Sequence, residues 1–224
     1  MGGTRFVGKA LVKSLIKENH QITLFTRGNQ PIPTNVEHIL GDRNSDSLKK
    51  LKGRKYDLII DSSGRKREET QNLIEITGRP TYRLIYISSA GVYANNELYP
   101  YLESSETDKT SRHYGKVETE NWLISENIPF TSFRPTYIYG PGNYNPIEKW
   151  FFDRIVNNKP IPIPDDGQLI TQLGHVSDLT SAIKISIVNK IAENKIYNCS
   201  GKLGTTIIGL IQTAAKVCGK EFNQ

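Results

Sequence analysis

The first twelve residues, Met1 to Val12, read MGGTRFVGKALV and decide the fold. Glycines at positions 2, 3 and 8 lead directly into apolar residues at helical spacing. Glycine lets a backbone approach a pyrophosphate closely, and the N–H groups at a helix N-terminus stabilise the anion. The stretch therefore predicts a phosphate-binding turn followed by a helix, although Arg5 occupies the middle position of the usual Gly-x-x-Gly-x-x-Gly spacing.

Apolar runs that alternate with helical stretches continue this pattern along the chain. We expect strands at residues 21–26, 36–40, 56–61, 82–89, 130–135 and 195–200. We expect helices at residues 45–52, 66–77, 111–125, 176–189 and 205–218. Continuous runs rich in Ile and Leu are typical of parallel strands that are covered on both faces. The alternation predicts an α/β fold with a doubly wound parallel sheet, which is a Rossmann-like nucleotide-binding fold.

The sequence from residue 139 onward is richer in turn-forming residues than the sequence before it. Long connections rich in Pro and Gly begin with YGPGNYNP at residues 139–146 and continue with NKPIPIPDDG at residues 158–167. We therefore assign residues 1–140 to a dinucleotide-binding domain. Residues 141–224 are expected to form a small C-terminal annex, interleaved with the core and incomplete at its end.

The start of the chain raises a separate expectation. In a doubly wound sheet the first strand is central and precedes the glycine turn, whereas this sequence starts with Met1-Gly2. The flanking strands would then expose unpaired backbone groups, at roughly 1–3 kcal/mol for each unsatisfied group. We expect such a chain to fold poorly or to form a homo-oligomer that hides the gap. A start assigned to an internal methionine, with upstream residues omitted, is the simpler interpretation.

Composition limits the class of protein. With 224 residues and 37% apolar residues, the chain can bury a sizeable core. No run approaches the roughly 20 apolar residues of a membrane span, and no secretory signal pattern is present, so we expect a cytosolic protein. The two cysteines, Cys199 and Cys218, have no metal-ligand spacing, and we expect neither a metal site nor a disulfide.

The net charge of +6 is unevenly distributed. Residues 1–67 hold 14 Lys and Arg against 6 Asp and Glu, whereas residues 68–224 hold 15 against 17. The densest basic runs are KKLKGRK at residues 49–55 and GRKR at residues 64–67. Such a field favours ligands that carry phosphate, from a dinucleotide to RNA, and the alternative is an ordinary solvated surface.

Arg27 follows the predicted strand at residues 21–26, at the position that selects between two cofactors. An acidic residue there binds a ribose 2′-hydroxyl, whereas an arginine suits a 2′-phosphate. We therefore expect NADP in preference to NAD, which stays possible. The alternative is that Arg27 is a surface turn residue.

Several motifs in consistent order resemble one family along nearly the whole chain. They are GGTRFVG (2–8), TRG (26–28), GDR (41–43), YISSAGVY (86–93), RHYGKVETE (112–120), FRPTYIYGPGN (133–143) and ITQLGHVSDL (170–179). These residues resemble an extended or atypical short-chain dehydrogenase/reductase of the NAD-dependent epimerase/dehydratase family. Within that family the chain is most similar to the branch of chloroplast stem-loop-binding proteins and their cyanobacterial relatives.

The resemblance implies a set of cofactor-binding residues. These are Gly2, Gly3, Thr4, Arg5, Phe6, Val7, Arg27, Asp42, Ser62, Lys116, Pro135 and Tyr137. It also implies a catalytic Ser, Tyr and Lys, in which the Tyr hydroxyl exchanges a proton with the substrate and the Lys lowers the pKa of that hydroxyl. Matched on SSAGVY and on Glu120, the serine is Ser89 and the lysine is Lys116.

The catalytic tyrosine has no counterpart in this register. Arg112 stands four residues before Lys116, where the family has Tyr. Arginine stays protonated at physiological pH and cannot act as the acid/base. Tyr114 projects about 200° around the helix from Arg112, so it is poorly placed to substitute. A shifted helix that brings in Tyr114 stays an alternative, as does the use of another residue, Tyr93 or His113.

Other residues have structural alternatives. Ser89 could satisfy backbone groups at a strand end instead of acting in catalysis. His175 is expected to fix the annex to the core or to cap a helix with Asp178.

Two functions from different classes follow. One is an RNA-binding or regulatory protein that keeps the dinucleotide fold and binds the dinucleotide without turning it over, and a weak endoribonuclease is a variant of this hypothesis. The other is an active NAD(P)-dependent nucleotide-sugar epimerase, dehydratase or reductase. The missing Tyr and the basic first third of the chain favour the RNA-binding protein, and whether the chain is an enzyme stays open.

Overall fold

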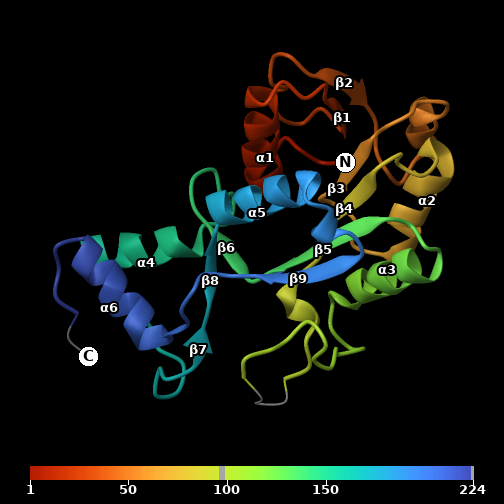
Figure 1. The fold of residues 1–224 in the computed structure, drawn as a ribbon. Helices are drawn as coiled ribbons and strands as arrows, with labels where there is room; N and C mark the ends of the chain where they lie inside the picture. The colour runs from red at the N-terminus through yellow and green to blue at the C-terminus, as the bar shows by residue number, and fades with distance from the viewer. Residues whose placement is uncertain (96–98, 223–224) are drawn as a thin grey trace.

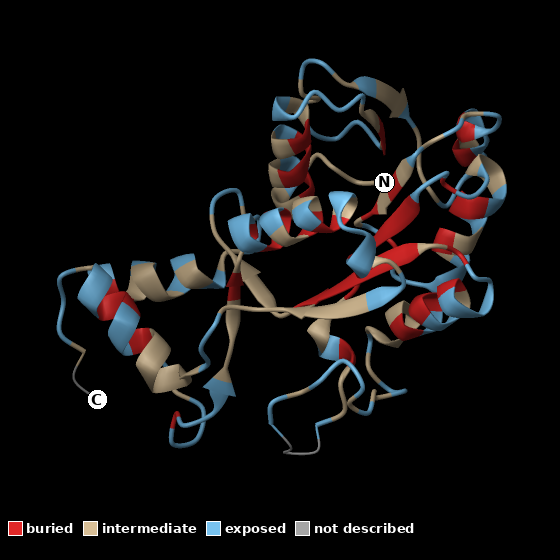
Figure 2. Cartoon of the chain, in the orientation of Figure 1, coloured by how far each residue is buried: buried red, intermediate tan, exposed pale blue. Residues whose placement is uncertain are grey.

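The structure is a computed structural model that describes residues 1–95 and 99–222, and its centre is a parallel sheet (Figure 1). The strands are β3 (Leu58–Asp61), β4 (Arg83–Ile87), β5 (Phe130–Pro135) and β9 (Lys195–Cys199), hydrogen-bonded in the order β3-β4-β5-β9. All three neighbouring pairs are parallel. Every residue of β4 and β5 is buried, including the polar residues Arg83, Thr131, Ser132 and Arg134 (Figure 2).

Helices cover both faces of this sheet, as the prediction of a doubly wound fold requires. The helix α1 (Phe6–Lys17) lies against α5 (Val176–Val188) on one face, where Leu11 and Ile183 pack with Ile85 of β4. On the other face lie α2 (Arg67–Thr77) and α3 (Tyr114–Ser125), which pack on the alternate residues Leu84 and Tyr86. The predicted α/β class is confirmed.

The strands β1 (Thr23–Thr26) and β2 (Glu37–Leu40) form a separate parallel pair. Within the described residues, no backbone ladder joins β1 to β3. At the end of β3, the Met1 amino group donates to the Ile60 carbonyl at 2.8 Å, and the Ser62 N–H donates to the Met1 carbonyl at 3.3 Å. Met1 therefore lies beside the end of β3, where its amino group and its carbonyl pair with backbone groups of Ile60 and Ser62.

Predicted and observed helices and strands agree closely up to residue 135. The segment predicted as a helix at residues 45–52 is a 3-10 helix, η1 (Asp46–Leu51), whose first turn is capped by Ser45. Two further short 3-10 helices, η2 (Ala90–Val92) and η3 (Lys190–Ala192), follow β4 and α5. None of the helices within residues 1–95 and 99–222 has the length and apolar character needed to cross a membrane.

The chain from residue 137 onward divides between two places. Its regular elements outside the main sheet are β6 (Tyr137–Tyr139), α4 (Ile147–Val156), β7 (Ile170–Thr171), β8 (Leu173–His175), β10 (Thr205–Thr206) and α6 (Ile207–Val217). The helices α4 and α6 pack on each other around Ile155, Ala214 and Ala215, away from the sheet (Figure 1). By contrast α5 and β9 return to the main body. The sequence analysis missed α4, β6, β7, β8 and β10.

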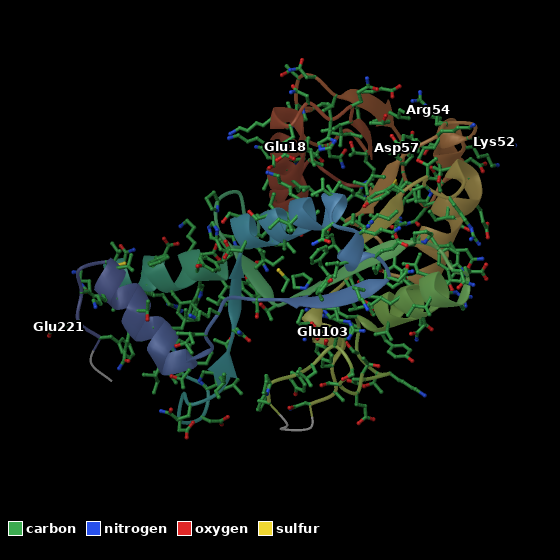
Figure 3. All side chains as sticks on the ribbon, in the orientation of Figure 1. Glu18, Lys52, Arg54, Asp57, Glu103 and Glu221 are labelled. Atoms are coloured by element: carbon green, nitrogen blue, oxygen red, sulfur yellow. The ribbon has the colours of Figure 1, made fainter. Side chains whose placement is uncertain are left out.

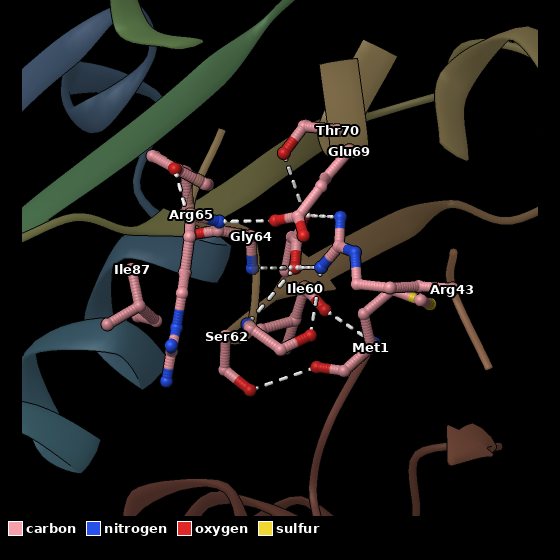
Figure 4. Close-up of polar contacts among 12 residues, drawn as sticks. Met1, Arg43, Ile60, Ser62, Gly64, Arg65, Glu69, Thr70 and Ile87 are labelled. Carbon is pink, nitrogen blue, oxygen red and sulfur yellow. Dashed lines mark hydrogen bonds and ion pairs between the residues drawn. The ribbon is translucent and has the colours of Figure 1, made fainter. Parts of the chain in front are cut away.

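A buried ion pair connects the β1–β2 pair with the main sheet. Arg43, from the loop after β2, donates from Nη1 and Nη2 to the two carboxylate oxygens of Asp61 at 2.7 and 2.9 Å (Figure 4). Asp61 ends β3 and is fully buried, and it also accepts from Thr70 Oγ1 and from the Gly64 N–H. Burial alone would raise the pKa of Asp61, but the hydrogen bonds and charge of Arg43 outweigh it and hold the pKa well below its usual value.

We predict that Asp61→Asn lowers the free energy of unfolding by about 3–5 kcal/mol, because it leaves the Arg43 charge buried without its partner. Urea unfolding followed by circular dichroism at pH 7 measures this. The native pKa of Asp61 is depressed, so its contribution is present above pH 4 and is lost as the pH falls below about 4.

The difference between the wild type and Asp61→Asn should therefore narrow at acid pH. Asp165→Asn, at an exposed turn, is the matched control and should change stability by less than about 0.5 kcal/mol. A loss in Asp61→Asn no larger than in this control would contradict the role of the pair.

Candidate nucleotide-binding site

A cleft of about 570 Å³ lies at the carboxyl ends of β1, β2 and β3. In open α/β sheets, ligands bind at this edge. The cleft is lined by nine of the residues that the sequence predicts to bind the cofactor, namely Gly2, Gly3, Thr4, Arg5, Phe6, Val7, Arg27, Asp42 and Ser62. The fold thus brings together residues that are up to sixty positions apart in the sequence.

The glycine turn has the geometry that its composition predicts. Gly3 has a φ of 104°, which favours glycine. A Cβ on Gly8 would lie 2.7 Å from the Gly3 backbone, so the first turn of α1 can approach the loop only because position 8 is glycine. The first turn of α1 holds no acidic residue and Arg5, its N-cap, makes no side-chain capping bond. The N–H groups at this helix start therefore face the cleft with a partial positive charge.

Three arginines line the cleft with exposed side chains: Arg5, Arg27 and Arg65. Within residues 1–95 and 99–222, none of their guanidinium groups has a carboxylate partner. The lining holds two carboxylates, Asp42 and Glu69, and they accept from the backbone N–H groups of Asn44 and Arg65 at 2.9 and 2.6 Å, so the three arginines outnumber them. The cleft therefore carries uncompensated positive charge suited to phosphate groups.

Lys116 points from α3 toward the end of β4. Its Nζ donates to the Ile87 carbonyl at 2.6 Å and to the Gly64 carbonyl at 3.0 Å, and it lies 5.2 Å from the centre of the Tyr86 ring. Burial lowers the pKa of Lys116 to about 8, although the charge of Asp61 opposes the shift. A lysine held this way beside the inner end of the cleft can donate hydrogen bonds to a ligand that reaches it.

Ser89 and the residues before α3 surround the same place. Ser89 Oγ accepts from the Gly91 N–H at 3.1 Å, so it caps η2. The side chain thus satisfies a backbone group after β4, which is the alternative to a catalytic role that we considered for Ser89. Arg112 is exposed and donates from Nε to His113 Nε2 at 3.1 Å. Burial, then the charges of Arg112, Lys116 and Arg65, lower the pKa of His113. Tyr114 is the first residue of α3, and its hydroxyl has no hydrogen-bond partner among the described residues.

A second buried ion pair sets the orientation of α3. Glu120 is fully buried and receives Arg134 Nη2 at 2.6 Å and Ser132 Oγ at 2.7 Å, both from β5. Lys116 lies one turn before Glu120 on the same side of the helix. Matching the family motif on Glu120 identified Lys116 as the lysine of the site. The direction in which the Lys116 side chain points agrees with that match.

The remaining predicted residues lie outside the lining of the cleft. Lys116 reaches its inner end from α3, and Pro135 is buried at the end of β5. Tyr137, in β6, donates its hydroxyl to the Asn145 carbonyl at 2.9 Å and so holds a loop of the annex. His175 caps α5, since the Ser177 N–H donates to its Nδ1 at 3.3 Å.

Arg65 and Tyr144 are among the residues of the cleft that the sequence did not predict. Arg65 enters from the segment after β3, where its side chain runs past Ile87 (Figure 4). Tyr144 enters from the annex loop after β6. The basic run at residues 64–67 was a signal for Arg65, but nothing local placed Tyr144 beside the glycine turn.

The family and the relatives of the chain agree with this geometry. A family model described as the NAD dependent epimerase/dehydratase family matches residues 1–200. The chain is 42% identical over 236 aligned residues to the chloroplast stem-loop binding protein of 41 kDa b of Arabidopsis thaliana. This match covers 98% of the chain and 62% of that protein, so the chain spans less than two thirds of its relative.

Solved structures share the fold at low sequence identity. The UDP-glucose 4-epimerase of Thermotoga maritima, solved with UDP-glucose, superposes with a TM-score of 0.83 at 17% identity, covering 99% of this chain and 82% of that one. The UDP-glucose 4-epimerase of Thermus thermophilus, solved with NAD, gives a TM-score of 0.79 at 17% identity, with coverages of 98% and 82%.

We predict that Lys116 titrates near pH 8, well below the ordinary lysine pKa of about 10.4, because its ammonium group is buried. The resonances of ¹³C-methylated lysines, followed by NMR through pH 6–11, measure this. Lys116→Arg should remove the early-titrating lysine signal, which separates it from the α-amino group of Met1. If every lysine resonance titrated near 10.4, the ammonium group would be solvated and the geometry described for Lys116 would be wrong.

Proposed function

Since the chain belongs to the NAD-dependent epimerase/dehydratase family, we propose that it binds a pyridine dinucleotide in the cleft and binds structured RNA without turning that dinucleotide over. The observation that carries the RNA-binding part is the 42% identity to a stem-loop binding protein across 98% of the chain. A cytosolic location and a homo-oligomer stay predictions.

Dinucleotide binding is supported by the cleft. Gly3 and Gly8 let the backbone approach a pyrophosphate, and the start of α1 faces the same space. Solved members of this fold hold NAD, as in the Thermus thermophilus epimerase. We propose NADP for this chain, because Arg27 is exposed at the end of β1 with no carboxylate partner in the described part of the chain, and an arginine suits a 2′-phosphate.

The proposed lack of turnover rests on Arg112. It stands four residues before Lys116, at the place of the acid/base in the family pattern, and its guanidinium group cannot exchange a proton at neutral pH. The helix predicted at residues 111–125 begins only at Tyr114, so Arg112 lies in the turn before it and the helical angle expected between Arg112 and Tyr114 does not apply. Lys116 keeps a function without a catalytic tyrosine, because its ammonium group can hold a ribose hydroxyl of the dinucleotide.

RNA binding is supported by charge as well as by the relative. The basic run at residues 49–55 begins in η1 and continues into the loop before β3, where Lys52 and Arg54 mark the outer rim of the nucleotide-binding part (Figure 3). Lys52 and Lys55 are exposed and make no ion pair within the described residues, whereas Arg54 is paired with Glu37 at 2.7 Å. Free lysines at a rim are suited to contact phosphates of a folded RNA.

The alternative function is an active nucleotide-sugar epimerase, dehydratase or reductase. The likeness to UDP-glucose 4-epimerases favours it, although at 17% identity that likeness concerns the fold. Dinucleotide-dependent conversion of a UDP-sugar that persists in Arg112→Ala and is abolished in Tyr114→Phe would overturn the proposal of no turnover and establish this alternative.

We predict that the wild type binds NADP more tightly than NAD, and that Arg27→Ala removes this preference. Loss of a charge-assisted bond to the 2′-phosphate should weaken NADP binding roughly tenfold or more and leave NAD binding unchanged. Isothermal titration calorimetry with both dinucleotides measures this. Arg79→Ala, an exposed arginine paired with Glu126 far from the cleft, is the control and should alter neither affinity. Equal losses for NAD and NADP in Arg27→Ala would argue against the 2′-phosphate assignment.

We predict that the protein shifts a stem-loop RNA in a native gel and that affinity falls steeply and linearly with the logarithm of salt concentration, because phosphate binding releases counterions. The variants Lys52→Ala and Lys55→Ala should weaken binding and reduce the salt slope by about one each. Lys202→Ala, an exposed lysine in the annex, serves as the control. A flat salt dependence, or no shift at low salt, would rule out this part of the proposal.

A further inference from the structure

Arg5 has an unusual position in the cleft. It replaces the middle glycine of the phosphate-binding turn, is exposed, and forms the N-cap of α1. Its guanidinium carbon lies 3.9 Å from the centre of the Tyr144 ring, and both side chains line the cleft. The contact joins the glycine turn to the annex, since Tyr144 belongs to the loop between β6 and α4.

The loop that carries Tyr144 is held in place from both ends. The Gly140 N–H donates to Glu148 Oε1 at 3.1 Å, and Glu148 also accepts from the Asn143 side chain at 3.4 Å. On the other side of Tyr144, the Asn145 carbonyl accepts the Tyr137 hydroxyl at 2.9 Å. The Tyr144 ring is 64% exposed, yet its backbone is fixed, so the ring provides a stable surface for Arg5.

Stacking leaves the hydrogen-bonding edge of Arg5 available. A guanidinium group that lies over an aromatic face keeps its N–H donors in its own plane, pointing away from the ring. Within residues 1–95 and 99–222, those donors have no acceptor. An arginine side chain loses much conformational freedom when it binds a ligand, and a contact that already orients it reduces that loss. Arg5 is thus a free, preoriented donor group beside the glycine turn.

We propose that Arg5 is a ligand of the pyrophosphate group and that Tyr144 is the residue that positions it. This inference rests on the proposed dinucleotide binding and assigns Arg5 and Arg27 to different phosphates. Arg5 contacts the pyrophosphate, which NAD and NADP share, whereas Arg27 contacts the 2′-phosphate, which only NADP has. A glycine turn usually binds a pyrophosphate through backbone N–H groups. Here the side chain of Arg5, which Tyr144 of the annex positions, adds its donors to those of the backbone.

Calorimetric titration of NAD and NADP into the full chain tests the assignment. Arg5→Ala should weaken both dinucleotides by the same factor, roughly tenfold or more, as expected for a charge-assisted bond. Tyr144→Ala should weaken both by roughly two- to fivefold, the effect of losing an exposed cation–π contact. Tyr144→Phe keeps the ring and should bind as the wild type does.

The double variant distinguishes positioning from direct contact. If Tyr144 acts through Arg5, Tyr144→Ala should have no further effect in the Arg5→Ala background. An undiminished effect of Tyr144→Ala in that background would overturn the positioning role. Unchanged affinities in Arg5→Ala would overturn the whole assignment.

Inorganic pyrophosphate, titrated into the same variants, separates this inference from the proposed function. If the wild type binds pyrophosphate but neither dinucleotide, and Arg5→Ala abolishes pyrophosphate binding, the dinucleotide proposal fails and the Arg5 ligand stands. If pyrophosphate binds equally well to the wild type and to Arg5→Ala, or to neither of them, Arg5 is not its ligand.

Discussion

The bidentate ion pair between Arg43 and Asp61 is the interaction on which the nucleotide-binding half depends. It crosses the interval between β1 and β3, where the described residues form no backbone ladder. Burying two charges is costly, and this pair offsets the cost with near-ideal geometry and with further donors from Thr70 and Gly64. It also fixes the loop after β2 against the end of β3, which places two walls of the cleft relative to each other.

A second buried ion pair determines which side chains lie at the inner end of the cleft. Glu120 and Arg134 are buried between α3 and β5, and the pair allows α3 to lie in one rotational setting. That setting turns Lys116 toward the end of β4 and leaves Arg112 exposed before the helix. In the proposed function Lys116 holds the dinucleotide, while Arg112, at the position proposed for the acid/base, carries a permanent charge.

Much of this could be predicted from the sequence, because the signals were local. Apolar runs with Ile and Leu located β3 and β4, and the glycine turn located the cleft. The annex was predicted less well. The helix α4 follows Pro146 and carries an exposed Trp150 beside a partly buried Phe151, so its pattern is weaker than that of a core helix. Turn-rich sequence around it also masked the short pairings of β6 with β8 and β7 with β10.

Contacts between distant segments could not be predicted at all. Nothing near Tyr144 in the sequence indicates that it meets Arg5, since the meeting depends on how the annex folds back over the turn. For the same reason the partners of Lys116 were missed, because the carbonyl groups of Gly64 and Ile87 belong to strand ends that only the parallel sheet brings together.

The small apolar cluster beneath α4 and α6 has a consequence for motion. It is built on Ile155, Ala214 and Ala215, two of which have the smallest apolar side chain, and it is separate from the two clusters that flank the main sheet. Local opening of a region costs free energy in proportion to the apolar surface it exposes. Separating α4 from α6 therefore exposes less apolar surface than unfolding the main sheet, and the two helices come apart at a lower cost in free energy than the main core does.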